Sequence, residues 1–122
     1  KTLLRIYSQM HSNNFAVIVY NSKSMATLKK MSASDIEKRV EKFQTWTVST
    51  KNDFLTQTFT FSSAVSALAF AAKVILHAEI LNHHPTIELN AGKVKIKLHT
   101  HDVKGLTSKD FDLAKKIDGL KL

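Results

Sequence analysis

The feature that most constrains the fold is a long apolar run that begins near Ala64 and stops at Asn82-His83-His84-Pro85. A serine just before the run can cap the start of a helix, and the residue before a proline is disfavoured in helical backbone. The sequence therefore predicts one helix of about twenty residues here, a length at which a helix normally needs tertiary packing to be stable.

Apolar residues surround this predicted helix almost completely, so a single sheet cannot cover it. They fall on two stripes. The first stripe is Val65, Leu68, Ala72 and Leu76, and the second is Ala67, Phe70, Ala71, Val74, Ala78 and Leu81. Because small residues permit close helix approach, we expect the second stripe to pack against another copy of the chain.

Two β-hairpins are predicted on either side of the helix. Residues 46–48 and 54–61 are rich in β-branched and aromatic types, and residues 51–53 supply a turn. Residues 86–90 and 93–100 flank a second turn, and Val94, Ile96 and Leu98 alternate with Lys93, Lys95 and Lys97. No aromatic residues interleave with these lysines, which favours a solvated sheet face over a nucleic-acid-binding stripe.

Two shorter helices complete the pattern. Ser34 with Glu37 forms a possible capping box for a helix that runs to about Phe43. Thr107 with Asp110 predicts a last helix that ends before Gly119, with Leu113, Ala114 and Ile117 on its buried side. The order helix, two strands, helix, two strands, helix predicts an α+β fold, in which a four-stranded antiparallel sheet carries three helices on one face.

Residues 1–30 differ from the single domain expected over residues 31–122. Residues 1–34 contain five Lys or Arg and no acid, whereas residues 35–122 contain thirteen against ten. The segment is either an extension of unclear role, in which Phe15–Tyr20 could add an edge strand, or an organelle-targeting segment. Without cysteine, thiol chemistry is excluded and a cytoplasmic location is expected. The apolar stretch from Ala64 to Leu76 is shorter than the roughly 20 residues that span a bilayer, so no membrane partner is expected.

Four histidines, His83, His84, His99 and His101, cluster at the ends of predicted elements. Imidazole titrates near neutral pH and suits general acid–base work. Glu79 lies four residues before His83, so we expect these two side chains to touch and His84 to point elsewhere. Solvent-facing histidines at a helix end are the plainer interpretation. A zinc site is a third, but the spacing fits no standard ligand motif, so no metal is expected.

The segment Glu79-x-x-x-His83-His84-Pro85, followed by His101, Gly105-Leu106-Thr107 and Asp110, resembles the signature of the pterin-4a-carbinolamine dehydratases, also known as dimerisation cofactors of a homeodomain transcription factor. The similarity covers Met31 to Ile117. It implies a hydro-lyase, 4a-hydroxytetrahydrobiopterin dehydratase, that recycles tetrahydropterin, with the pterin as substrate and no cofactor. It implies catalytic roles for His83, His84 and His101, and substrate-binding or orienting roles for Glu79, Pro85, Thr100, Asp110 and Ile87.

The resemblance also implies a homotetramer built on the long helices, and a non-enzymatic role as a transcription cofactor acting through the same helix is the alternative. Strict alternation places His101 on the lysine face, so the strand is expected to end or bend near Thr100. Ile87 stands where the family usually has Trp, and Ala91 where it usually has an aromatic residue. We therefore expect a weaker pocket wall and looser pterin binding, because an aromatic ring contributes stacking that Ile lacks.

Overall fold

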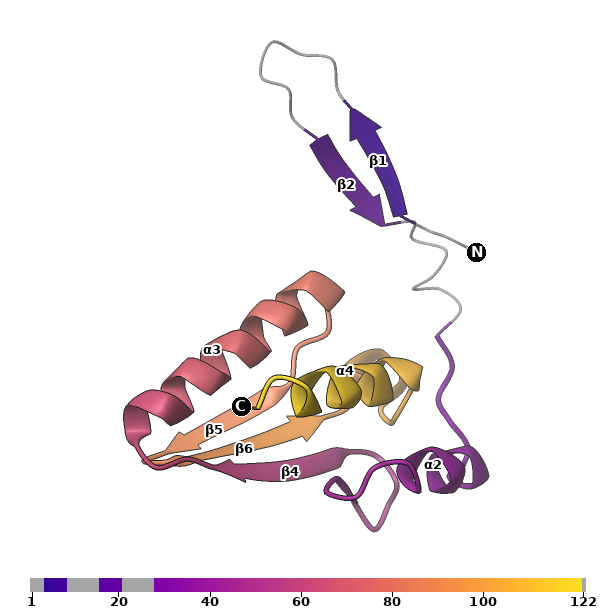
Figure 1. The fold of residues 1–122 in the computed structure, drawn as a ribbon. Helices are drawn as coiled ribbons and strands as arrows, with labels where there is room; N and C mark the ends of the chain where they lie inside the picture. Colours follow the sequence, from indigo (N-terminus) through magenta and orange to yellow (C-terminus); the bar gives the residue numbers. More distant parts are fainter. Residues whose placement is uncertain (1–3, 9–15, 21–27, 122) are drawn as a thin grey trace.

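The computed structural model describes residues 4–8, 16–20 and 28–121. After strands β1 (Leu4–Ser8) and β2 (Ala16–Tyr20), the element order is α2 (Ala33–Val40), β3 (Thr47–Val48), β4 (Leu55–Thr60), α3 (Ala64–Leu81), β5 (Thr86–Asn90), β6 (Lys93–Leu98) and α4 (Ser108–Asp118). A short 3-10 helix, His101–Val103, lies between β6 and α4. The predicted α+β class and the order of helices and strands after residue 30 are confirmed (Figure 1).

The main sheet has the strand order β3-β4-β6-β5, and all its neighbours are antiparallel. Pairing between β4 and β6 joins the two predicted hairpins, from Leu55 opposite Leu98 to Thr60 opposite Lys93. Because side chains alternate along a strand, this register gathers the apolar residues on one face and the lysines on the other. Val94, Ile96 and Leu98 are fully buried.

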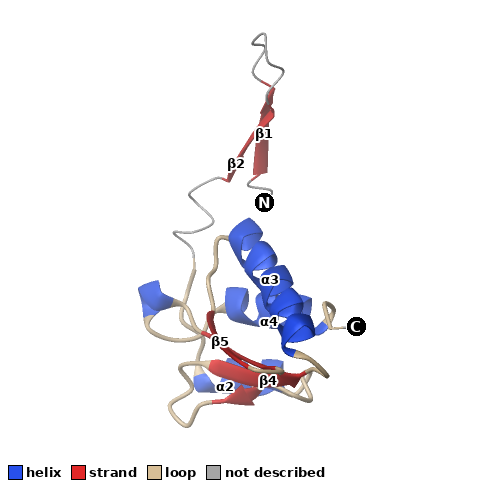
Figure 2. Ribbon diagram, turned by 90° about the vertical axis from the view of Figure 1, so that its left-hand side faces the viewer, coloured by secondary structure: helices blue, strands red, loops and turns tan. Residues whose placement is uncertain are grey.

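Helices α3 and α4 cover the apolar face of this sheet, and both views show them on the same side of the strands (Figures 1 and 2). Helix α2 adds Ile36 to the same core, and the Phe43 ring that follows α2 lies 5.9 Å from the Phe111 ring of α4. Leu113 and Ile117 of α4 are fully buried. Each fully buried Leu, Ile or Phe side chain contributes about 1.5–3 kcal/mol, so burial in this layer stabilises the fold.

The helix caps agree with the sequence in one case and differ in another. Thr107 and Asp110 form the predicted capping box at the start of α4. The predicted start of the first helix is wrong, because Ser32 and not Ser34 accepts the bond from the Asp35 amide, at 3.2 Å. The Met31 amide donates to the Leu106 carbonyl at 2.8 Å, which holds the chain just before Ser32 beside the segment that leads into α4.

The prediction for the two apolar stripes of α3 is wrong, because the second stripe packs in this chain's own core and the first stripe is exposed. The second stripe supplies Ala67, Phe70, Ala71, Val74 and Ala78 to the core of this same chain. The first stripe is exposed, with Leu68 at 58% and Leu76 at 59%. The alanines of the second stripe let α3 approach its own sheet closely. The first stripe, which contains Leu68 and Leu76, therefore faces away from the sheet.

Helix α3 is long and apolar enough to cross a membrane by length and composition, with 18 residues and a mean hydropathy of 1.7. The expectation that this stretch is too short is therefore wrong, because the helix continues to Leu81. One side of α3 nevertheless packs on a sheet, with Phe70 only 4.8 Å from the Phe59 ring between centroids. That packing is typical of a core helix, although only 28% of the helix is buried and its other side is exposed.

The expected N-terminal strand is present but does not extend the main sheet. Strand β2 covers Ala16–Tyr20 and pairs antiparallel with β1, and the two form a separate two-stranded sheet. The predicted edge strand is therefore wrong in its pairing, because a nearby segment of the same extension supplies the partner. Phe15 lies outside the described residues.

The β5–β6 turn generates a stability prediction. Ala91 has φ 52°, a left-handed value that costs an L-residue about 1–2 kcal/mol, whereas a Cβ on Gly92 would lie 2.6 Å from the Phe61 carbonyl oxygen. Ala91→Gly should therefore raise the free energy of unfolding by about 0.5 kcal/mol, after the entropy cost of glycine. Gly92→Ala should lower it. Urea denaturation of both variants checks this, and a loss of stability in Ala91→Gly would contradict it.

Candidate active site

The C-terminal end of α3 places two neighbouring histidines in different environments. Asn82 adopts the left-handed conformation with φ 50°, its amide donates to Glu79, and the His83 amide donates to the Ala78 carbonyl at 3.0 Å. These are the bonds of a Schellman motif, for which Asn is one of the few residues suited at the left-handed position. The turn directs His83 into the protein, where it is 8% exposed, and leaves His84 exposed.

The His83 ring is held by a buried carboxylate. Its Nε2 lies 2.6 Å from Oδ1 of Asp110, and Asp110 is fully buried. The other carboxylate oxygen, Oδ2, accepts the Thr107 amide at 2.9 Å and the Thr100 hydroxyl at 2.7 Å. The Thr107 hydroxyl lies 2.8 Å from that of Thr100 and completes the group.

This arrangement determines the state of the His83 ring. A carboxylate in the first turn of α4 is favoured by the helix dipole, and the three donors offset the loss of water around the charge. An ionised carboxylate can only accept hydrogen bonds, so the contact between Asp110 Oδ1 and Nε2 makes Nε2 the donor and leaves Nδ1 of the neutral ring as an acceptor. The arrangement is the carboxylate–histidine pair that acid–base enzymes use to fix a tautomer.

The segment after β6 brings Thr100 and His101 to the same place. Strand β6 ends at Leu98, and an isolated bridge between Thr100 and Gly105 closes a small loop, with the Thr100 amide donating to the Gly105 carbonyl at 2.8 Å. His101 begins the 3-10 helix within this loop, and Lys104 ends it at φ 50°. The expectation that the strand ends near Thr100 is confirmed, because β6 ends at Leu98 and His101 begins the 3-10 helix.

The predicted contact between Glu79 and His83 is wrong. Glu79 Oε2 lies 3.3 Å from Nε2 of His84 instead, and both side chains are more than half exposed. The Schellman turn breaks the helical spacing after Leu81, so the rule that residues four apart face each other no longer applies at His83. An ion pair this exposed contributes little to stability, about 0–1 kcal/mol.

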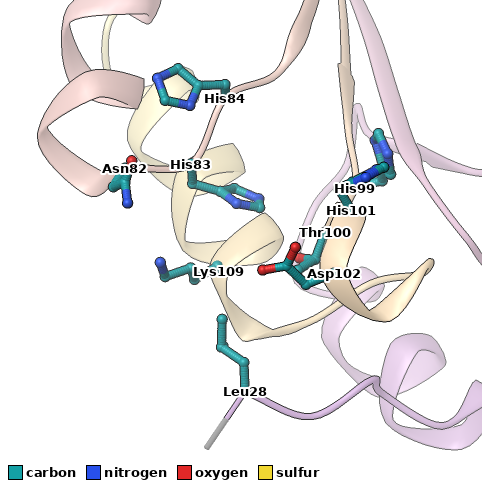
Figure 3. A pocket seen from close by; sticks show the side chains of 9 residues that line it. All are labelled: Leu28, Asn82, His83, His84, His99, Thr100, His101, Asp102 and Lys109. Carbon is teal, nitrogen blue, oxygen red and sulfur yellow. The ribbon is translucent and has the colours of Figure 1, made fainter. Parts of the chain in front are cut away.

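A cavity of about 250 Å³ lies between these elements. Figure 3 shows His83 pointing into it from the end of α3, the Asp102 carboxylate facing it from the loop after β6, and the His99 and His101 rings beside one another across it. The lining residues are Leu28, Asn82, His83, His84, His99, Thr100, His101, Asp102 and Lys109. Three of the predicted catalytic residues, His83, His84 and His101, thus line one cavity.

Other predicted residues lie elsewhere. Ile87 is half-buried and packs against the core beside its sheet partner Ile96, and Ala91 lies in the turn at the far end of the β5–β6 hairpin. Neither lines the cavity, nor does Pro85. Ile87 lies on β5 and Ala91 in the turn after it, so neither forms a wall of this cavity, and the expected looser pterin binding stays a prediction.

Several residues that line the cavity were not predicted from the sequence, notably Asn82, Asp102 and Lys109, and neither was the link from Thr107 to the site. The sequence contained a signal for Asp102 and for Thr107. Asp102 follows His101 in a segment that had to bend, and Thr107 was recognised as a helix cap but not as part of a hydrogen-bonded group. Within the described residues, no three His, Cys, Asp or Glu side chains are grouped so that they could hold a metal ion.

Comparison with known proteins identifies relatives over most of the chain. Residues 29–120 match the family model for pterin 4 alpha carbinolamine dehydratase. A protein of Roseiflexus sp. (strain RS-1), provisionally named pterin-4-alpha-carbinolamine dehydratase, is 43% identical over 77% of this chain and 97% of its own length. A protein of Picosynechococcus with the same provisional name is 38% identical over 79% of this chain and its whole length.

Among solved structures, a transcriptional coactivator/pterin dehydratase from Brucella melitensis is 26% identical, covers 75% of this chain and 98% of its own, and gives a TM-score of 0.72. With the family model matching most of the chain, the fold and the sequence agree. The chain belongs to the pterin-4a-carbinolamine dehydratase family.

The buried Asp110 generates a prediction that needs no substrate. In Asp110→Asn the amide nitrogen cannot accept a hydrogen bond, so at least one donor among His83, Thr100 and the Thr107 amide loses its acceptor. The free energy of unfolding should fall by about 1–3 kcal/mol. Asp112→Asn is the matched control, since Asp112 lies on the same helix but is exposed and only 3.5 Å from Arg39, and it should change stability by less than about 0.5 kcal/mol. Equal effects in urea denaturation would contradict this account of Asp110.

Proposed function

We propose that this chain removes water from a 4a-hydroxytetrahydropterin and releases quinonoid dihydropterin, as its family membership implies. The observation that carries the proposal is the contact of His83 with the buried Asp110 at the wall of a cavity that His84 and His101 also line. Acid–base groups of this kind are what the reaction needs. No redox or phosphoryl chemistry is involved, and the pterin is the substrate, so the proposal includes no cofactor.

The reaction moves one proton on and one proton off the pterin. The bond between C4a and its hydroxyl oxygen breaks, and the oxygen takes a proton and leaves as water. The N5–H proton passes to a base, and the electron pair it leaves behind forms the double bond between N5 and C4a. Positioned acid and base groups typically contribute 10²–10⁴-fold each to such a step.

We assign the base to His83. Its Nε2 proton is held by Asp110, so Nδ1 is the nitrogen that can take a proton from N5. The imidazolium formed in this way would be stabilised by the buried carboxylate beside it, as in other carboxylate–histidine pairs. Thr100 and Thr107 act through Asp110 and are positioning residues.

We assign the acid to His101, with His84 holding the pterin from the other side. His101 is exposed and begins a short helix, so its ring can regain a proton from solvent after each turnover. His84 is joined to Glu79 at 3.3 Å, which orients a ring that would otherwise rotate freely. Glu79 therefore keeps an orienting role, but toward His84 and not toward His83.

Single histidine variants test the proposal. His83→Ala and His101→Ala should each lower kcat roughly a hundredfold or more, the usual contribution of a positioned acid or base. The matched control is His77→Ala, because His77 lies on α3 outside the cavity and should change kcat little. The measurement is an absorbance assay with synthetic 4a-hydroxytetrahydropterin. Unaltered rates in both site variants, or activity abolished by a chelator, would refute the assignment.

We also propose that the exposed face of α3 packs against a second copy of this chain in a homo-oligomer, with a tetramer expected from the family. Helix α3 exposes Val65, Leu68, Ile75, Leu76 and Ile80, each by about half or more. Contiguous apolar surface of this kind is uncommon on proteins that remain monomers. The Brucella protein is described as a transcriptional coactivator as well as a pterin dehydratase, so another protein binding the same face is the alternative function.

Leu68→Glu tests the assembly, because an unpaired charge buried in an interface costs several kcal/mol. The variant should be a folded monomer by light scattering and circular dichroism. Lys73→Glu is the control, since Lys73 is exposed on α3 and lines a surface pocket with Phe61 and Phe70 that does not include Leu68, and it should leave the assembly intact. A monomeric unmodified protein at micromolar concentration would contradict the proposal and favour the partner-binding alternative.

A further inference from the structure

A second cavity of about 240 Å³ adjoins the first. Its lining consists of Asp53, Phe54, Lys97, His99, His101 and Lys104. His99 and His101 line both cavities, and their ring centroids are 6.4 Å apart, so the two spaces meet at these rings. A molecule whose reacting part contacts His101 in the first cavity therefore has the second cavity directly beside it.

The sizes of the two cavities support a shared ligand. Pockets for small molecules usually hold about 300–1,000 Å³. Each cavity alone is smaller than that, whereas the two together fall within the range. One ligand that extends past the two histidine rings would fill both.

The second cavity has a cationic character. Lys97 Nζ lies 4.0 Å from the centroid of the Phe54 ring, a cation–π contact that holds the ammonium group at the wall. Lys104 adds a second positive charge from the left-handed end of the 3-10 helix. Asp53 opposes them, so the fixed lining charge is positive by one before either histidine takes up a proton.

Asp53 is engaged on its own side of the cavity. Its Oδ1 accepts the Ser49 hydroxyl at 2.5 Å, and its amide donates to the same hydroxyl at 3.0 Å. The Ser49 hydrogen bond lowers the pKa of Asp53, and the nearby Lys51 and Lys97 charges act in the same direction. The Ser49 hydroxyl therefore occupies one of the hydrogen-bonding positions of the Asp53 carboxylate. Asp53 is the acidic residue among those that line the second cavity, so it is the carboxylate there that opposes the two lysines.

We propose that the second cavity binds an anionic substituent of the pterin, a phosphoryl or carboxylate group, with Lys97 and Lys104 as the binding residues. The inference rests on the proposed function, because it places the pterin ring against His83 and His101. It specifies the class of substrate: a pterin whose side chain carries negative charge, in preference to one with a neutral polyol. The Phe54 ring would contact the carbon chain between the ring and the anionic group.

Calorimetric titration with three oxidised pterins that differ in the side chain tests the inference. The ligands are neopterin, which is neutral there, neopterin monophosphate, and pterin-6-carboxylate. The phosphate ligand should bind roughly tenfold or more tightly than neopterin, as expected for charge-assisted hydrogen bonds, and the preference should decline with added salt. A preference for pterin-6-carboxylate instead would assign the cavity to a short carboxylate.

Variants that remove charge then test which lysines cause the preference for a pterin with an anionic side chain. Lys97→Gln combined with Lys104→Gln should remove it while leaving the Kd of neopterin unchanged, and Lys97→Arg should retain it. The matched control is Lys93→Gln combined with Lys95→Gln, which removes the same charge from exposed positions of the same strand outside the cavity. If the double variant does not fold, Lys104→Gln alone tests the same point, because it should weaken the preference for the anionic ligand.

The outcomes separate this inference from the proposed function. Equal affinity for the three ligands, together with dehydration of 4a-hydroxytetrahydropterin, overturns the anionic subsite and leaves the dehydratase intact. A preference lost equally in the Lys93 and Lys95 control overturns the subsite as well, because the effect then comes from general charge. If no pterin binds and no dehydration occurs, the proposed function fails and the inference with it.

Discussion

The structure depends on a buried negative charge and on the three donors that surround it. A carboxylate removed from water costs several kcal/mol unless its oxygens are hydrogen-bonded, so Asp110 constrains everything that must contact it. The contacts come from three places: His83 at the end of α3, Thr100 after β6, and the Thr107 amide at the start of α4. The same bonds therefore link the ends of α3 and β6 to the start of α4 and hold the His83 ring at the cavity wall.

Neighbouring residues acquire different chemistry because the backbone reverses between them. His83 and His84 are the same side chain, but one follows the left-handed Asn82 into the core and the other stays in solvent beside Glu79. The buried ring has its tautomer fixed by a charge, whereas the exposed ring is only oriented. The two adjacent histidines therefore have different surroundings: His83 is buried against Asp110, and His84 is exposed beside Glu79.

Helix α3 connects the site to the surface of the molecule. Its inner side packs on the sheet through small residues, and its outer side leaves Leu68 and Leu76 exposed. Glu79 projects from the outer part of the same helix and reaches His84 at the rim of the cavity. An oligomer built on this face would therefore cover surface next to the histidines, so assembly and substrate access involve one element.

The sequence by itself determined the elements and several of the residues at the site. Period-two alternation in Val94, Ile96 and Leu98, the Thr107–Asp110 cap and the His84–Pro85 stop are local signals, and local backbone preferences decide them. Only the tertiary structure decided that His83 meets Asp110 and not Glu79, that Ala71 faces its own sheet, and that Ile87 belongs to the core. These are choices between partners far apart in the chain. They depend on where the Schellman turn points His83 and on which stripe of α3 fits against the sheet, and neither can be read from residue spacing.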